Sequence, residues 1–402
     1  MDINRKTFLG QSLAAYASLD SLSSLGVASR PDKDKLRVGI IGCGRMGQYY
    51  AEVYQAFPDT EIVAIAEWNA ERRKIVGKRF RVKAIYKDVN SMLRDTIPDI
   101  TAVITPTKYM KEAVIACAEA GVKGVTTDKP IAAKLSDADE MVNACEKRGV
   151  VFGGGNLQRA MPEVQEAAQR LKAGKYGRPT GMAVHGFGGE ISGGGCQHVS
   201  VLRLFSGAEV EEVMAWAGPP EALEKKDDAG LNVNALFQMS RGPNCRVFGL
   251  AETSGERPLN GVDVWSEDAL IRWKWGKPEI YEKINSSGAR QQIDPKYRPF
   301  SGRKIIDQIP GLRQSDDYLV ASIRSFIDSV KTRSGLWISG HDLRQALEVA
   351  IACKVSARLG NLPVKLPLED RSMTLYPRPY RWLGGDATEK PQSGQDASGE
   401  EA

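Results

Sequence analysis

The fold class is clearest in the stretch Leu36-Arg37-Val38-Gly39-Ile40-Ile41-Gly42-Cys43-Gly44-Arg45-Met46-Gly47. Its first half is a short apolar run with several β-branched residues, which is typical of a buried strand. Its second half has the spacing G-x-G-x-x-G. Glycines so spaced allow a tight turn, a close approach of the backbone to a pyrophosphate, and packing of a helix on the strand. The stretch therefore predicts the phosphate-binding turn of a dinucleotide-binding βαβ unit.

A carboxylate at the expected distance supports this interpretation. Glu67 follows a second apolar run over 61–66 and lies about 20 residues beyond Gly47. A carboxylate there accepts hydrogen bonds from ribose hydroxyls and repels a 2′-phosphate, so Glu67 favours NAD, with NADP as the alternative. Arg72 and Arg73, one helical turn later, are the residues that could bind such a phosphate. We interpret both as part of a solvent-exposed helix face.

Strand-like and helix-like stretches alternate over residues 34–155. Strands are expected at 36–41, 61–66, 83–86, 100–105, 124–127 and 150–153. Such alternation predicts an N-terminal Rossmann domain of the α/β class, a doubly wound parallel sheet covered on both faces. Ligands of this fold bind beyond the carboxyl ends of the strands. We therefore expect Gly42, Glu67, Thr105 and Asp128 on one rim.

The pattern changes after Gly155. Strand-like runs follow at 180–187, 208–216, 231–240, 244–252 and 268–275, and helices are expected at about 315–332 and 340–359. Consecutive strands without helices between them predict a C-terminal α+β domain over 156–383, with a mostly antiparallel open sheet. Residues 384–402 are rich in Gly, Ser, Gln and Glu and are predicted to be disordered.

Composition excludes several classes of function. The 55 Lys and Arg against 50 Asp and Glu give a charge of +5 without a basic block, which argues against a nucleic acid partner. No run approaches the roughly 18 apolar residues of a membrane span. Six scattered cysteines without a C-x-x-C pair, and three histidines, predict no metal site.

Residues 1–33 are interpreted as a leader. Arg5-Lys6 precedes an Ala/Leu/Ser-rich run, which resembles a twin-arginine export signal, although Lys6 replaces the second arginine and Asp20 interrupts the apolar run. We expect export to the periplasm. The alternative is a degenerate leader on a cytoplasmic enzyme.

Several further motifs share the predicted rim or follow it in the chain. They are Thr105-Pro106, Asp128-Lys129-Pro130, Gly193-Gly194-Gly195 and Ser339-Gly340-His341-Asp342. Together with the glycine loop, they make the chain resemble the Gfo/Idh/MocA family from about Lys35 to Pro367. The resemblance implies NAD(P)-dependent oxidation or reduction of a sugar, polyol or cyclitol carbon. It also implies a small carbohydrate-like substrate and a homo-oligomer.

Lys129 is the residue expected to carry the chemistry. Hydride transfer requires that the reacting hydroxyl lose its proton. A lysine beside the cofactor can stabilise the alkoxide, or act as a base if burial lowers its pKa. The cofactor itself is expected to contact Gly42, Cys43, Gly44, Arg45, Met46, Gly47, Glu67, Thr105, Pro106, Asp128 and Lys129.

The sequence departs from the resemblance at a second motif. Relatives have Gly-x-His-x-x-Asp at a helix start, and its His and Asp complete the proton-transfer set. Here Gln197 and Ser200 occupy those places, and neither replaces a titrating side chain well. Three accounts are open. His198 takes the proton role through a one-residue rearrangement, Lys129 and water support a different or slower chemistry, or the chain binds its ligands without turnover.

Other residues are candidates for substrate contact. Asn156, Gln158 and Arg159 fall where relatives place side chains against substrate or nicotinamide, as do Lys129 and Gln197. His185 lies in a predicted strand. Because successive side chains of a strand point to opposite faces of the sheet, His185 points either to the pocket or into the core. Two other functions stay open, a glycosidase or lyase that retains its NAD and oxidises the sugar transiently, and a non-catalytic sensor of sugar or dinucleotide.

Overall fold

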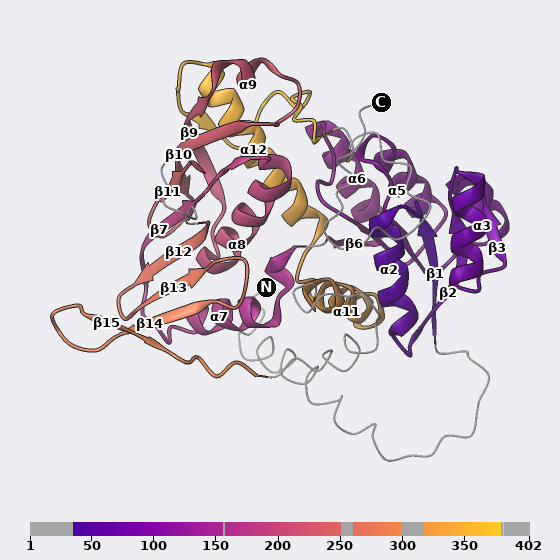
Figure 1. Cartoon of the computed structure of the whole chain (residues 1–402), viewed down its shortest axis with the longest axis horizontal. Helices are drawn as coiled ribbons and strands as arrows, with labels where there is room; N and C mark the ends of the chain where they lie inside the picture. Colours follow the sequence, from indigo (N-terminus) through magenta and orange to yellow (C-terminus); the bar gives the residue numbers. More distant parts are fainter. Residues whose placement is uncertain (1–34, 156, 251–259, 299–316, 379–380, 382–402) are drawn as a thin grey trace, which may run out of the picture. The chain divides into compact units, whose positions relative to one another are not determined.

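The computed structural model describes residues 35–155, 157–250, 260–298 and 317–378, together with Arg381 (Figure 1). The predicted leader over 1–33, the predicted tail over 384–402 and the candidate Asn156 lie outside the described residues. In the described part, no helix has both the length and the apolar character needed to cross a membrane.

The first sheet is parallel throughout. Its strands are β1 (Leu36–Ile41), β2 (Thr60–Ala66), β3 (Ala84–Tyr86), β4 (Ile100–Val103), β5 (Gly124–Thr127) and β6 (Val151–Gly154). They lie in the order β3-β2-β1-β4-β5-β6, and each neighbouring pair is parallel. The order reverses at β1, which is the switch point where such sheets bind ligands. The predicted Rossmann sheet is confirmed.

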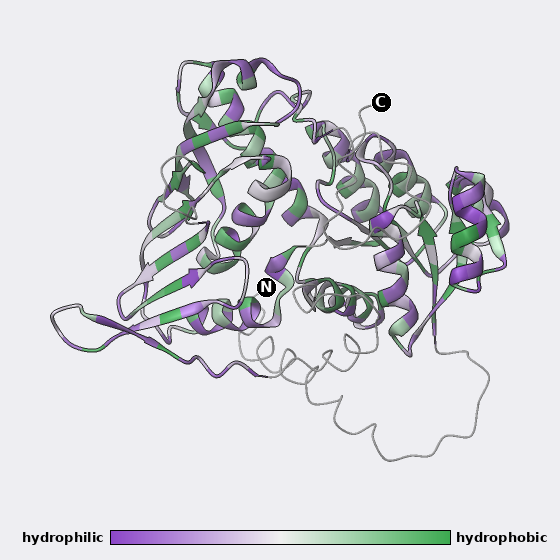
Figure 2. Cartoon of the chain, in the orientation of Figure 1, coloured by the Kyte–Doolittle hydropathy of each residue, from purple (hydrophilic) through white to green (hydrophobic). Residues whose placement is uncertain are grey.

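Helices cover both faces of this sheet. They are α2 (Arg45–Ala56), α3 (Ala70–Arg79), α4 (Val89–Asp95), α5 (Met110–Glu119) and α6 (Leu135–Lys147). A further helix, α11 (Asp317–Thr332), comes from far along the chain, and its Phe326 packs in one buried cluster with Val38 and Ile40 of β1. Figure 2 shows hydrophobic residues in green on β1 and along α11. One of the helices that pack on the first sheet therefore comes from residues that the sequence analysis assigned to the C-terminal domain.

The second sheet is mixed and larger. Its strands are β7 (Pro179–His185), β8 (Gly188–Gly189), β9 (Val210–Gly218), β10 (Leu231–Met239), β11 (Cys245–Phe248), β12 (Gly261–Ser266), β13 (Ala269–Trp273), β14 (Glu279–Lys283), β15 (Arg290–Ile293) and β16 (Val364–Lys365). The order is β15-β14-β13-β12-β7-β11-β10-β9-β16, with β8 paired to β10. Among the described strands of this sheet, only β7 and β11 pair in parallel. The prediction of a mostly antiparallel sheet is confirmed.

One face of the second sheet is packed against helices. α8 (Cys196–Ser206) contacts β7 and β12, while α12 (Gly340–Arg358) contacts β9 and α8. α7 (Pro162–Lys172) packs on α8, and the short α9 (Pro220–Glu224) lies against β9. Nearly every residue of α8 is buried, so this helix forms the centre of the second domain's core. Its N-terminus holds Gln197, His198 and Ser200.

Candidate active site

The three glycines of the loop differ in what surrounds them. Gly42 has φ +84°, and a Cβ added there would lie 2.5 Å from the carbonyl oxygen of Ile104. A Cβ on Gly47 would lie 1.9 Å from the carbonyl oxygen of Gly42, so α2 can approach the turn only through a glycine. Gly44 has no atom within 4 Å of such a Cβ. The backbone is thus closed around Gly42 and Gly47 and open at Gly44, which is where a pyrophosphate can approach.

Glu67 connects the end of β2 to this loop. Its carboxylate accepts hydrogen bonds from the backbone N–H of Cys43 at 2.8 Å and of Asn69 at 2.9 Å. It also forms an ion pair with Arg72 at 3.4 Å, and both side chains are buried. The prediction that Arg72 is solvent-exposed is therefore wrong, because a buried carboxylate requires a partner charge. Arg73 donates to the carbonyl oxygen of Glu67 at 2.6 Å.

Unsatisfied hydroxyls lie at the carboxyl ends of the next two strands. The side-chain oxygens of Thr105, after β4, and Thr127, at the end of β5, are buried and have no hydrogen-bond partner among the described residues. Buried polar atoms of folded proteins usually have partners. With the open Gly44 and the carboxylate of Glu67, these hydroxyls fit a dinucleotide lying along this edge. Arg45 and Met46 begin α2, and Pro106 precedes a short helix, Thr107–Tyr109.

Lys129 follows the end of β5 on the same edge. The carboxylate of Asp128 accepts a hydrogen bond from the backbone N–H of Lys129 at 2.8 Å. Burial lowers the pKa of Lys129, and the charge of Arg381 lowers it further, while Asp128 and Glu190 act in the opposite direction. A larger fraction of this amine is therefore neutral near neutral pH than for an ordinary lysine. Only the neutral amine can accept a proton.

Gln197 joins the two parts of the site. Its side-chain oxygen accepts a hydrogen bond from the backbone N–H of Gln158 at 2.9 Å, which ties α8 to the turn that follows β6. The side-chain oxygen of Gln158 is buried and has no partner among the described residues. Contact of Gln158 or Gln197 with substrate stays a prediction. The geometry gives Gln197 a positioning role and no proton to transfer.

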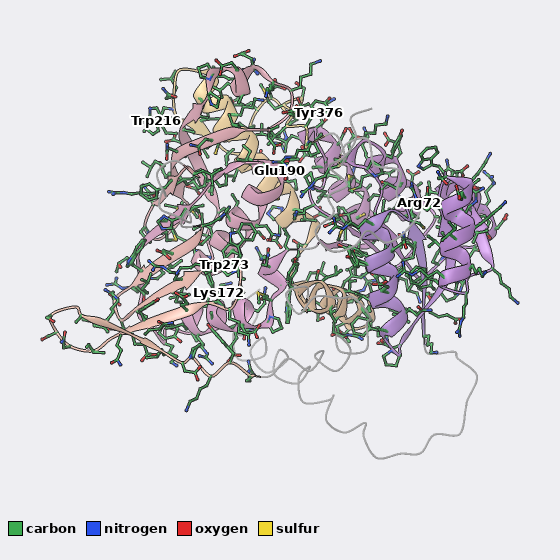
Figure 3. All side chains as sticks on the ribbon, in the orientation of Figure 1. Arg72, Lys172, Glu190, Trp216, Trp273 and Tyr376 are labelled. Carbon is green, nitrogen blue, oxygen red and sulfur yellow. The ribbon has the colours of Figure 1, made fainter. Side chains whose placement is uncertain are left out.

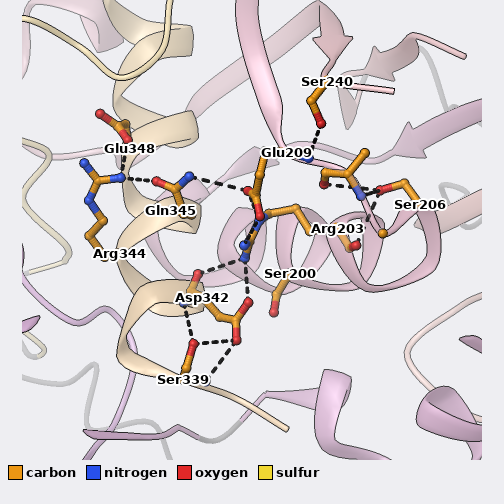
Figure 4. Close-up of polar contacts among 12 residues, drawn as sticks. Ser200, Arg203, Ser206, Glu209, Ser240, Ser339, Asp342, Arg344, Gln345 and Glu348 are labelled. Carbon is orange, nitrogen blue, oxygen red and sulfur yellow. Dashed lines mark hydrogen bonds and ion pairs between the residues drawn. The ribbon is translucent and has the colours of Figure 1, made fainter. Parts of the chain in front are cut away.

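Arg159 belongs to a buried ionic network, of which Figure 4 shows Arg203 and Asp342. It forms an ion pair with Asp342 at 3.0 Å and donates to the carbonyl oxygens of Trp337 and Ser200. Arg203 also pairs with Asp342, at 2.8 Å. Burial raises the pKa of Asp342, but the two arginines outweigh it and the pKa falls to about 2. These partners occupy Arg159 within the core, so its placement does not support the expected substrate contact.

Ser200 lies in the same part of the core. It is fully buried, and its hydroxyl has no hydrogen-bond partner among the described residues. Its backbone carbonyl oxygen accepts a hydrogen bond from Arg159 at 3.2 Å, so Ser200 lies against the ionic network of the core. A catalytic role for Ser200 stays a prediction.

His198 points into an aromatic cluster. The centroid of its ring lies 5.2 Å from the ring centroid of Trp275, 6.0 Å from that of Trp273 and 6.0 Å from that of Phe187. Its Nε2 lies 2.6 Å from the side-chain oxygen of Asn260. Trp273 is labelled in Figure 3. Burial lowers the pKa of His198 to about 4. A neutral, enclosed imidazole does not support the account in which His198 takes the proton role.

The burial of His198 predicts a pH dependence of stability. The unfolded chain binds a proton here below about pH 6.5 and the folded chain only below about pH 4. The contribution of the neutral His198 to the free energy of unfolding is therefore complete above about pH 6.5. On the order of 3 kcal/mol of it is lost as the pH falls from there to about pH 4. We expect urea unfolding of His198→Gln to lose most of that dependence between about pH 7.5 and about pH 4.5. His341→Gln, at an exposed histidine, is the control, and an equal change in both variants would contradict the assignment.

His185 faces the other side of the second sheet. It alternates with the buried Val184, lies 3.3 Å from Asp263, and stacks on Phe248 with ring centroids 5.4 Å apart. Asp263 in turn pairs with Arg272. The helix that carries Gln197 packs on β7 from the opposite face. His185 is therefore not brought together with Lys129, and its placement does not support the pocket alternative.

Sequence reasoning missed three charged residues of the site. Glu190 precedes the turn Ile191–Gly195 that leads into α8, and its Oε1 lies 3.2 Å from Nε of Arg381. Asp228 is fully buried and accepts a hydrogen bond from the backbone N–H of Ser192 at 2.6 Å. The sequence offered one indication of Asp228, namely the two adjacent acidic residues Asp227-Asp228 shortly before a predicted strand. Among the described residues, no group of three or more His, Cys, Asp or Glu could hold a metal ion.

Comparison with known proteins agrees with this geometry. Residues 36–155 match the family model of the Gfo/Idh/MocA proteins, described as an oxidoreductase family with an NAD-binding Rossmann fold. A myo-inositol 2-dehydrogenase from Thermotoga maritima is 28% identical over 336 residues, which cover 80% of this chain and 96% of the relative. A D-apiose dehydrogenase from Paraburkholderia graminis is 30% identical over 145 residues, 36% of this chain and 38% of the relative.

Solved structures share the fold over most of the chain. A levoglucosan dehydrogenase in complex with NADH and levoglucosan has a TM-score of 0.67 at 18% identity, covering 83% of this chain and 100% of that one. An oxidoreductase from Agrobacterium radiobacter in complex with NAD+, L-tartaric acid and magnesium has a TM-score of 0.64 at 20% identity, covering 82% and 98%. At this identity the likeness shows the fold alone, including that of the second sheet.

Proposed function

We propose that the chain, whose residues 36–155 match the family model of the Gfo/Idh/MocA oxidoreductases, is an NAD-dependent dehydrogenase of a sugar, polyol or cyclitol. The names of its relatives support this substrate class, because they include dehydrogenases of inositols and of apiose. The observation that carries the proposal is the placement of Lys129. It follows β5 at the carboxyl edge of the same parallel sheet whose first strand ends in the glycine loop.

The residues that would hold the cofactor are those of the first sheet's carboxyl edge. The open backbone at Gly44 and the N-terminus of α2 suit the pyrophosphate, and the carboxylate of Glu67 suits the ribose. The hydroxyls of Thr105 and Thr127 are available as donors along the same edge. Bound NAD supplies the hydride acceptor for oxidation, and its reduced form the donor for the reverse reaction.

Lys129 handles the proton of the reacting hydroxyl. Its neutral amine can accept that proton at Nζ as the carbon loses hydride, and its ammonium can return it in the reverse direction. Gln197 carries no titrating group, and Ser200 and His198 are enclosed, so the proton leaves Nζ to water. Of the three accounts open from the sequence, this geometry supports Lys129 acting with water.

One experiment separates this proposal from its alternatives. The purified full-length chain is denatured to identify any bound nucleotide, and sugars, polyols and glycosides are then tested with and without added NAD. Formation of reduced nicotinamide only with added NAD supports the dehydrogenase. Glycoside cleavage without net change in the cofactor would indicate the retained-NAD enzyme. Binding of NAD and sugar without turnover of any compound would indicate the sensor.

We also propose that the second sheet forms a homo-oligomer through its face opposite α8. Trp216 on β9 (Figure 3) and Leu236 on β10 lie on neighbouring strands, and are 47% and 37% exposed. Neighbouring exposed apolar side chains on a sheet are typical of an interface. Trp216→Glu is expected to convert the oligomer to monomer in sedimentation experiments, with the fold retained. A wild-type chain that sediments as a monomer would contradict the proposal.

A further inference from the structure

A segment near the C-terminus contacts both the domain of the first sheet and the domain of the second sheet. This segment, the C-terminal strap, comprises residues 368–378 and Arg381, beyond the part of the chain covered by the family resemblance. On one side, the backbone N–H of Leu375 donates to Ala133 at 2.8 Å, and that of Leu135 donates to Met373 at 3.1 Å. On the other, the N–H of Asp228 donates to Tyr376 at 3.2 Å. The strap therefore contacts both the segment after Lys129 and the segment before β10.

Side chains hold the strap in place. Arg371 forms ion pairs with Asp139 of α6, at 2.7 Å, and with Glu348 of α12. Leu375 is fully buried in the large core cluster. Bidentate and networked arginine pairs of this kind have well-defined geometry. These contacts fix residues 368–378 against α6 and α12.

Arg381 lies at the turn that leads into α8. Its carbonyl oxygen accepts a hydrogen bond from the hydroxyl of Thr107 at 3.0 Å, and its Nε lies 3.2 Å from Oε1 of Glu190. A Cβ added at Gly193 would lie 2.5 Å from Nη1 of Arg381 and 2.8 Å from Oε1 of Glu190. The ion pair is therefore packed on Gly193. The side chain of Glu190, labelled in Figure 3, is 14% exposed and that of Arg381 is 23% exposed, while Oε1 of Glu190 and Nη1 of Arg381 are themselves buried.

The same pair lies close to Lys129. The charges of both Arg381 and Glu190 act on Lys129, and the charge of Arg381 also acts on Cys196 at the start of α8. Asp128 is the other charged group that faces Lys129. The hydroxyl of Thr107, which follows Thr105 and Pro106 at the same sheet edge as Lys129, also donates to the carbonyl oxygen of Arg381 at 3.0 Å. This contact and the charge interactions place the Glu190–Arg381 pair at the edge that carries Lys129.

We propose that the Glu190–Arg381 pair binds hydroxyls next to the reacting carbon, and that it selects neutral polyhydroxylated substrates over sugar acids and sugar phosphates. This inference rests on the proposed dehydrogenase function and names the substrate class of the same site. It assigns Arg381, from outside the region of family resemblance, to the substrate side of the site.

The chemistry of the pair supports a neutral ligand. A guanidinium alone would favour a carboxylate or phosphate, which it binds through two parallel hydrogen bonds. Here Glu190 already supplies the carboxylate, and an anionic substituent at this place would meet its charge at short range. Oε1 of Glu190 is buried, lies 3.2 Å from Nε of Arg381 and has no hydrogen-bond partner among the described residues, so it keeps the capacity to accept a hydrogen bond from an enclosed hydroxyl. The guanidinium can donate to the neighbouring hydroxyl oxygen.

Matched neutral and acidic sugars test this selectivity. The probes are D-glucose with D-glucuronate and D-galactose with D-galacturonate, assayed with NAD in the wild-type chain and variants. We expect kcat/KM of the wild type to favour the neutral member at least about 10-fold, and Glu190→Gln to shift that ratio toward the acid by about 10-fold or more, since each factor of ten is about 1.4 kcal/mol. Arg381→Gln is expected to raise KM for the neutral sugars more than it changes kcat. Arg378→Gln, at an exposed arginine of the same strap, is the control.

A second readout needs no substrate. Competitive acetylation of Lys129, followed by mass spectrometry of its peptide across a pH series, reports the pKa of this amine. We expect Arg381→Gln to raise that pKa and Glu190→Gln to lower it, with no shift in Arg378→Gln. An unchanged labelling profile in the first two variants would show that the pair does not lie at Lys129, and would overturn the inference for any substrate.

The two proposals fail in different ways. Turnover that needs Lys129 but has the same neutral-to-acid ratio in wild type and Glu190→Gln would overturn the inference and leave the dehydrogenase standing. Altered labelling of Lys129 in a chain that turns over no sugar would overturn the dehydrogenase, and with it the selectivity.

Discussion

Replacing Lys129 by methionine is expected to lower kcat by about 1,000-fold or more, within the range known for removal of a general acid–base group. Methionine keeps the length and most of the volume of the side chain but cannot exchange a proton. Because Gly44, Glu67 and Thr105 are the residues that we propose hold the cofactor, the affinity for NAD should change little. Steady-state kinetics and titration of NAD by fluorescence give the two quantities.

Two further variants make this prediction specific. Lys147→Met, at an exposed lysine at the end of α6, should leave kcat unchanged. Lys129→Ala should regain part of its activity when small primary amines are added, because an amine can occupy the vacated space and accept the proton. Retention of most of the wild-type kcat by Lys129→Met would exclude Lys129 as the proton-handling group.

Alanine at Gly44 and alanine at Gly47 are expected to have opposite consequences. The added methyl at Gly44 meets no protein atom, so the free energy of unfolding should stay within about 0.5 kcal/mol of wild type. The same methyl lies where the pyrophosphate approaches, and we expect NAD affinity to fall about 100-fold, or near 2.7 kcal/mol. Gly44 therefore tests ligand binding without disturbing the fold.

At Gly47 the fold itself is affected. A Cβ 1.9 Å from the carbonyl oxygen of Gly42 forces α2 away from β1, and overpacking of this kind costs about 1–3 kcal/mol or more. Urea unfolding and NAD titration of both variants provide the comparison. Equal loss of stability in Gly44→Ala and Gly47→Ala would contradict the distinct roles assigned to the two glycines.

The first sheet could be predicted because its signals are local. Apolar runs such as Leu36–Ile41, each followed by a helical pattern, specify buried parallel strands, and the glycine spacing locates the turn. The second sheet was predicted in type but less completely. β12 and β14 were not expected, since their formation depends on pairing with neighbouring strands. β-structure is decided largely by packing against cross-strand neighbours, which a single sequence does not reveal.

The charged groups of the site were harder to predict. The sequence located Lys129 and the loss of the His and Asp beside it, but it could not show that Arg72 is buried against Glu67 or that Arg159 is held by Asp342. Arg381 was the hardest residue to predict, because its pairing with Glu190 spans nearly half of the chain and depends on the path of the C-terminal strap. Long-range ion pairs of this kind have no local signature.

Transfer of a labelled hydride tests the central claim most directly. The wild-type chain is incubated with NAD and with sugars and inositols that carry deuterium on every carbon, and the mass of the reduced cofactor is measured. The account predicts that the nicotinamide gains deuterium in the wild type and gains it about 1,000-fold more slowly, or more slowly still, in Lys129→Met, although both bind NAD. Consumption of the sugar with an unlabelled cofactor, or labelling that is equal in the Lys129→Met variant, would contradict it.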